Sequence, residues 1–125
     1  MILDTNALSA FADGDPNLLP VIEKEPGLAL PVIVLGEYLY GIHQSRFRVR
    51  YQRWLDANLS LFDLLAVGLE TARGYAELRR ELKTAGTPIP SNDAWIASLA
   101  REHRLPVVTR DVHFRAVRGL HLLTW

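Results

Sequence analysis

The sequence contains no cysteine among its 125 residues, which excludes disulfide bonds and thiolate metal ligands. Any metal ion must therefore be held by oxygen or imidazole ligands. The chain also lacks an uninterrupted apolar run of roughly 18 residues, and it does not begin with a basic segment followed by an apolar one. We therefore expect a soluble, cytoplasmic protein without a membrane segment.

An excess of charge is missing as well, because 14 basic residues balance 14 acidic ones. Such a protein does not hold nucleic acid by bulk electrostatics, so any contact of that kind needs a local basic patch. Internal repeats and low-complexity tracts are absent too. By length, residues 1–125 are expected to form a single domain with a core of its own.

Short apolar segments alternate with helical ones along the chain. The expected strands cover residues 1–4, 27–30, 60–64, 107–109 and 120–123, and the expected helices cover residues 7–11, 17–24, 32–43, 68–85 and 91–103. Ser91 is the expected N-cap of the last helix. The helix over 32–43 is apolar nearly all round, which predicts a core element. Apolar strands that alternate with helices predict an α/β fold with a parallel sheet.

Four carboxylates stand beside apolar residues, where their charge is costly. Asp4 ends the first strand, Glu37 interrupts the apolar helix, Asp93 falls in a first helical turn, and Asp111 follows the strand over 107–109. Ligands of an open parallel sheet bind beyond the carboxyl ends of its strands, where Asp4 and Asp111 would lie. Taken singly, Asp93 could merely stabilise its helix, and Asp4 and Asp111 could be turn residues. Glu37 is hardest to explain in this way, because an unpartnered buried carboxylate costs several kcal/mol.

Four carboxylates in one pocket would repel one another and raise their own pKa values unless a divalent cation were present. Oxygen ligands alone suit Mg²⁺ or Mn²⁺ better than Zn²⁺. Such an ion can lower the pKa of a water molecule and neutralise charge on a scissile phosphate, so the reaction needs no histidine base and no serine or cysteine nucleophile. The sequence therefore predicts a metal-dependent hydrolase, and a nuclease in particular.

Short motifs surround these four acidic positions. In chain order they are Leu3-Asp4-Thr5-Asn6, Gly36-Glu37, Pro90-Ser91-Asn92-Asp93 with Ile96-Ala97, and Val108-Thr109-Arg110-Asp111 with Phe114. With these motifs the chain resembles the PIN-domain ribonucleases over essentially its full length, and specifically the VapC-type toxins of prokaryotic toxin–antitoxin pairs. Asp-Thr-Asn alone is a weak signal, whereas all four motifs in this order and at these separations are a strong one.

The resemblance implies a three-layer α/β/α sandwich and a Mg²⁺- or Mn²⁺-dependent endoribonuclease that hydrolyses RNA with a metal-activated water. It also implies a homodimer, and a cognate VapB-like antitoxin that inserts into the site. The catalytic and metal-binding residues would be Asp4, Glu37, Asp93 and Asp111, and the supporting residues Asn6 and Thr109. The fourth acidic position varies within the family.

Outside the acidic set, three arginines share one face of the segment after residue 45. Arg46, Arg50 and Arg53 either form a solvated face or contact RNA or an acidic partner such as the antitoxin. The aromatic residues on the other face are expected in the core or in a dimer interface: Phe47, Tyr51 and Trp54. The histidines show no pair at metal-ligand spacing, so direct catalysis is not expected of them, although His113 is nearest to the site in sequence.

Two alternatives to an endoribonuclease stay open. A PIN-like fold could keep its acidic pocket and serve as an RNA-binding or scaffold module without turnover. Alternatively, the metal-dependent hydrolysis could act on DNA or on small phosphoesters. Metal titration followed by incubation with RNA and with matched DNA separates these possibilities.

Overall fold

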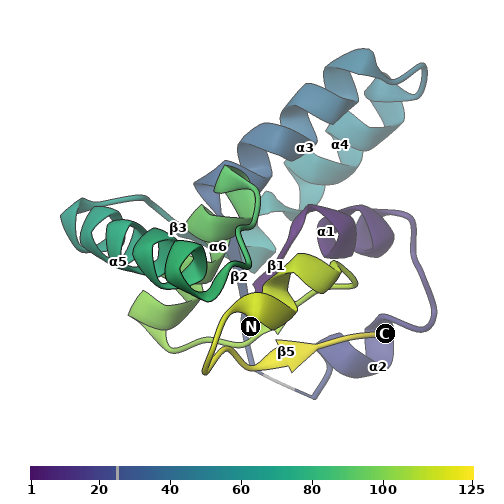
Figure 1. The fold of residues 1–125 in the computed structure, drawn as a ribbon. Helices are drawn as coiled ribbons and strands as arrows, with labels where there is room; N and C mark the ends of the chain where they lie inside the picture. Colours follow the sequence, from purple (N-terminus) through teal and green to yellow (C-terminus); the bar gives the residue numbers. More distant parts are fainter. Residues whose placement is uncertain (25) are drawn as a thin grey trace.

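A computed structural model describes residues 1–24 and 26–125 (Figure 1). Within these residues, five parallel strands form one sheet: β1 (Ile2–Leu3), β2 (Leu28–Pro31), β3 (Phe62–Leu65), β4 (Val107–Val108) and β5 (Leu122–Leu123). Their order across the sheet is β3-β2-β1-β4-β5. From β1 the chain therefore adds β2 and β3 on one side, and then crosses to add β4 and β5 on the other side of β1. The α/β fold with a parallel sheet is confirmed.

Helices connect successive strands. They are α1 (Thr5–Ala12), α2 (Leu19–Ile22), α3 (Val32–Gln44), α4 (Arg48–Asn58), α5 (Leu69–Ala85) and α6 (Ser91–His103), with short 3₁₀ helices η1 (Leu59–Leu61) and η2 (Val112–Ala116). Figure 1 shows α5 and α6 packed together on one side of the central strands and α1 packed against α3 and α4 on the other. Helices thus flank the sheet as a three-layer α/β/α sandwich requires. Across the described part of the chain, we find no helix whose length and apolarity would let it span a membrane.

The central strands owe their continuous apolar sequence to burial on both faces. The side chains of β1 and β4 and of Leu30 in β2 are fully buried, and Met1 is nearly so. At the end of α5, Gly86 takes a positive φ of 72° and donates its N–H to the last carbonyls of the helix. The predicted end of this helix is therefore confirmed.

Three local expectations differ from the structure. The helix over 32–43 corresponds to α3, which buries Val34, Tyr38 and Ile42 in the core as expected. Its other face is exposed, with Tyr40 at 65%, because α3 and α4 form a hairpin that projects from the body of the molecule (Figure 1). Ser91 is the first residue of α6 and not its N-cap, because Pro90 occupies the cap position. The helix expected over 17–24 is reduced to the four residues of α2.

Candidate active site

The four predicted carboxylates come from four elements that meet at the carboxyl ends of β1 and β4. In the parallel pairing of these strands Leu3 lies opposite Val108, so the next residues, Asp4 and Thr109, emerge side by side. Asp111 follows two residues later and caps η2. Glu37 reaches the same place from the middle of α3, and Asp93 from the first turn of α6.

Asp4 is the most deeply buried of the four, with 4% of its surface exposed. Its Oδ1 accepts the backbone N–H of Ala7 at 2.8 Å, which makes Asp4 the N-cap of α1. Its Oδ2 accepts the hydroxyl of Thr109, and that hydroxyl accepts the backbone N–H of Asp111 at 2.9 Å. Burial raises the pKa of the Asp4 carboxyl against the lowering effect of these bonds, and the charge of Asp111 adds to the increase.

Glu37 is held by side chains from two other helices. Thr5 of α1 donates its hydroxyl to Oε2, and Asn92 of α6 donates its amide N–H to Oε1. Each oxygen of the Glu37 carboxylate is therefore held by a hydrogen bond. Neither Thr5 nor Asn92 is among the predicted site residues, although each stands next to a predicted carboxylate in its motif. That adjacency was the one signal that could have identified them.

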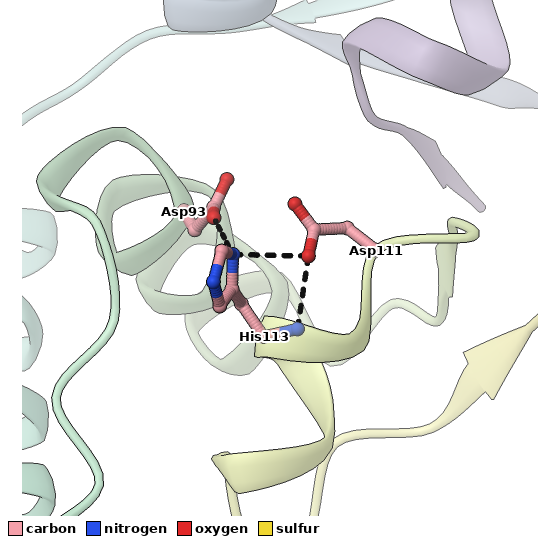
Figure 2. A group of neighbouring side chains, drawn as sticks. All are labelled: Asp93, Asp111 and His113. Carbon is pink, nitrogen blue, oxygen red and sulfur yellow. Dashed lines mark hydrogen bonds and ion pairs between the residues drawn. The ribbon is translucent and has the colours of Figure 1, made fainter.

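His113 lies between Asp93 and Asp111 (Figure 2). Its Nδ1 is 3.3 Å from Asp93 Oδ2 and 3.0 Å from Asp111 Oδ1, and Asp111 Oδ1 also accepts the backbone N–H of His113 at 2.9 Å. One ligand atom from each of the three residues lies within 4.8 Å of the others, close enough to share a metal ion. The sequence did not indicate this arrangement, because the expected sign was a second histidine at metal-ligand spacing, whereas the partners of His113 are carboxylates.

The four carboxylates also interact electrostatically. Burial raises the pKa of Asp93, and the charges of Asp111 and Glu37 raise it further, whereas the neighbouring His113 lowers it. Because Asp111 also raises the pKa of Asp4, the like charges form one connected cluster. We call Asp4, Glu37, Asp93 and Asp111 the acidic cluster. Negative charge concentrated in this way favours a bound cation.

The raised pKa values predict how the metal-free protein responds to pH. Asp93 binds its proton more readily in the folded than in the unfolded chain, so its charge opposes folding at pH values above its raised pKa, and acidification toward the ordinary value of 3.8 relieves that cost. The Asp93→Asn variant carries no charge at this position, so its folding does not bear this cost. In chelator, we expect the variant to melt at a higher temperature than wild type at about pH 8, and the gap to narrow at about pH 5. A gap that is constant over this range would contradict the prediction.

The other predicted residues lie at the margin of the acidic cluster or away from it. Asn6 is exposed, and its backbone N–H bonds to the Asp4 carboxylate. Arg46, Arg50 and Arg53 are exposed on the α3–α4 hairpin, where the Arg46 guanidinium lies 5.0 Å from the centre of the neighbouring Phe47 ring.

The aromatic residues of this hairpin divide between core and surface. Trp54 packs edge-on against Phe11 at 5.6 Å between ring centres, which agrees with the expected core position. Tyr51 is half-buried. Phe47 precedes α4 and is 49% exposed, so of its two expected positions the core is excluded and the dimer interface stays a prediction.

Comparisons with known proteins were made with both the sequence and the fold. The family described as PIN domain matches residues 1–120. Ribonuclease VapC2 of Rickettsia felis is 33% identical, over 99% of this chain and 96% of its own, and Ribonuclease VapC5 of Mycobacterium tuberculosis is 32% identical, over 94% and 87%. Among solved structures, VapBC2 from Rickettsia felis bound to a DNA fragment from its promoter superposes with a TM-score of 0.87 at 31% identity, covering 99% of this chain and 97% of the other.

Proposed function

The chain belongs to the PIN domain family, and on this basis we propose that it is a metal-dependent endoribonuclease and the toxin of a VapBC-type toxin–antitoxin pair. The observation that carries the proposal is the acidic cluster itself, in which carboxylates from four separate elements meet beyond the carboxyl ends of β1 and β4. This is the edge at which parallel sheets bind their ligands. The four carboxylates are the proposed catalytic residues.

The donor atoms of the cluster fit a divalent cation. Carboxylate oxygens predominate and one imidazole is in reach, a set that suits Mg²⁺ or Mn²⁺. We propose Asp4, Glu37, Asp93 and Asp111 as the residues that hold the ion, and the position of His113 makes it a further donor. When bound, the ion would neutralise charge on the scissile phosphate and lower the pKa of a water molecule, so that hydroxide is available as the nucleophile.

The chain's own polar residues prepare this site. Thr109 fixes the orientation of Asp4, while Thr5 and Asn92 fix Glu37, so two of the carboxylates are already oriented before any ligand arrives. Before an ion binds, the imidazole of His113 lies between Asp93 and Asp111, where it offsets their repulsion. Orientation by neighbouring hydrogen bonds matters because small displacements of ligand atoms weaken metal binding.

Thr109→Val tests this orientation. Valine keeps the size of the side chain but removes the hydroxyl that joins Asp4 to the backbone of Asp111. We expect metal affinity or cleavage rate to fall by roughly 10- to 100-fold, as is usual for residues that orient metal ligands. Isothermal titration with Mn²⁺ and a cleavage assay measure the two effects. Thr84→Val, at an exposed position of α5, is the matched control and should change neither. Equal values for both variants would contradict the role of Thr109.

The partners proposed are RNA and a cognate VapB-like antitoxin. The VapBC2 structure and a toxin–antitoxin complex from Klebsiella pneumoniae, at a TM-score of 0.79, are structural relatives of this chain. We propose Arg46, Arg50 and Arg53 as contacts to RNA phosphate or to the antitoxin, since exposed guanidinium groups bind phosphates and carboxylates. A homodimer stays a prediction. We propose the cytoplasm as the site of action, because cellular RNA is there.

The activity is tested by incubating the purified chain with total RNA and with DNA of matched sequence. We expect cleavage of RNA, and no cleavage of DNA at the same protein and Mg²⁺ concentrations. Expression of the chain should arrest growth, and sequencing of the new RNA ends would identify the target. Cleavage of DNA at an equal rate would instead support the alternative of a general metal-dependent nuclease.

A further inference from the structure

A cavity of about 330 Å³ opens beside the acidic cluster, between α1 and the α3–α4 hairpin. Thr5 and Glu37 belong to both its lining and the site already described. A ligand in the cavity would therefore adjoin the place where a scissile phosphate would lie. The lining also includes Asp13, Tyr38 and Tyr51.

Tyr38 carries an unusual buried hydroxyl. The residue is 7% exposed, and its hydroxyl oxygen has no hydrogen-bond partner among the described residues. Buried tyrosine hydroxyls nearly always have such a partner. Tyr38 lines the cavity together with Asp13 and Tyr51. Its hydroxyl is thus a hydrogen-bond donor without an acceptor.

Asp13 supplies an acceptor in the same cavity. It is the residue that follows α1, and one carboxylate oxygen accepts the hydroxyl of Tyr51 at 3.1 Å. An ionised carboxylate accepts several hydrogen bonds, so Asp13 can also receive an N–H group from a ligand. Among the described residues, the lining includes the carboxylates of Asp13 and Glu37 but no lysine or arginine. This charge disfavours a phosphate and favours a neutral group that offers both an N–H and a carbonyl oxygen.

We propose that this cavity receives the base of the nucleotide beside the scissile phosphate, and that Asp13 and Tyr38 select guanine over uracil. The inference rests on the proposed ribonuclease function. Single-stranded RNA is read by hydrogen bonds to the Watson–Crick edges of its bases. Guanine offers neighbouring ring and exocyclic N–H groups to the Asp13 carboxylate and an O6 acceptor to the Tyr38 hydroxyl. Uracil lacks the exocyclic amino group and presents a carbonyl oxygen in its place.

The test is cleavage of a random-sequence oligoribonucleotide pool, with the new ends sequenced. For wild type we expect guanine to exceed uracil by about fivefold or more at one position beside the cut, the low end of discrimination by such base contacts. Tyr38→Phe and Asp13→Asn should each reduce this ratio severalfold. The matched controls are Tyr40→Phe, which lies on α3 but is 65% exposed, and Asp63→Asn, at an exposed position of β3; both should keep the wild-type ratio.

The outcomes separate this inference from the function on which it rests. If wild type cleaves RNA and neither cavity variant alters its base preference, the cavity is not a base site, although the ribonuclease function stands. If wild type cleaves no RNA, the proposed function fails. Variants that keep the base preference but escape inhibition by the antitoxin would assign the cavity to that protein and overturn the inference.

A measurement without catalysis provides the second check. Free guanosine and uridine are titrated into wild type while the ring resonances of Tyr38 are followed by NMR. Guanosine should shift these resonances saturably and at lower concentration than uridine, and Asp13→Asn should remove the difference. Equal binding of the two nucleosides would contradict the proposal. Tyr38→Phe removes an unpartnered buried hydroxyl, so its melting temperature should not fall, and a changed preference would not reflect unfolding.

Discussion

Asp93→Asn is expected to slow RNA cleavage by roughly a hundred- to a thousandfold, the cost of removing one group that stabilises charge in a transition state. The carboxylate lies in the first turn of α6, 3.3 Å from His113, and in electrostatic contact with Asp111 and Glu37. Asparagine keeps its shape but removes the negative charge and one ligand oxygen. Initial cleavage rates of wild type and variant, measured at the same Mg²⁺ concentration, give the ratio.

The same substitution should leave the fold intact, which separates lost chemistry from lost structure. Removing the charge forfeits its favourable interaction with the N-terminus of α6, typically 0.3–1 kcal/mol. It also removes the burial and like-charge repulsion that raise the pKa of Asp93, which acts in the opposite direction. Asp63→Asn, on an exposed position of β3, is the control with unchanged activity. A folded Asp93→Asn protein that cleaves RNA at the wild-type rate would refute the assignment. Expression of the inactive variant should no longer arrest growth.

The placement of two carboxylates followed from strand geometry. Residues 1–3 and 107–108 are apolar without alternation, which predicts buried parallel strands, and strand ends of a parallel sheet share an edge. Asp4 and Thr109 lie side by side because β1 and β4 are neighbours in register. That adjacency is a property of the strand order, since 105 positions separate the two residues in the chain. Only the family resemblance pointed to Thr109 beforehand.

The contacts that orient Glu37 could not be predicted in this way. Thr5 lies 32 positions before it and Asn92 55 positions after it, and no periodicity connects the three helices that carry them. The same limit explains why only one face of the helix over 32–43 lies in the core. An apolar sequence indicates that a surface prefers to be covered, but it does not say whether the chain itself covers it, and Tyr40 of α3 is left exposed on the hairpin.

Removal of divalent metal is the second large effect that we expect. In excess EDTA, cleavage of RNA by the wild-type protein should fall to background, and Mg²⁺ or Mn²⁺ added beyond the chelator should restore it. The reason is that the acidic cluster provides the negative charge to hold a cation, whereas the chain places no lysine or arginine among the contacts of these carboxylates in the described residues. Full activity in EDTA would contradict metal dependence.

Thermal melting tests metal binding without relying on catalysis. A ligand that binds the folded chain at about a hundred times its Kd stabilises it by about 2.7 kcal/mol, which raises the melting temperature measurably. We expect Mn²⁺ to raise the melting temperature of wild type and to have a much smaller effect on Asp93→Asn. The two readouts together separate the hypotheses. Stabilisation by metal together with cleavage identifies a nuclease, whereas stabilisation without cleavage of any cellular RNA would favour a PIN-like binding module. In that case the acidic cluster would hold its cation for structure alone, and Asp93→Asn would cost stability in metal but no activity.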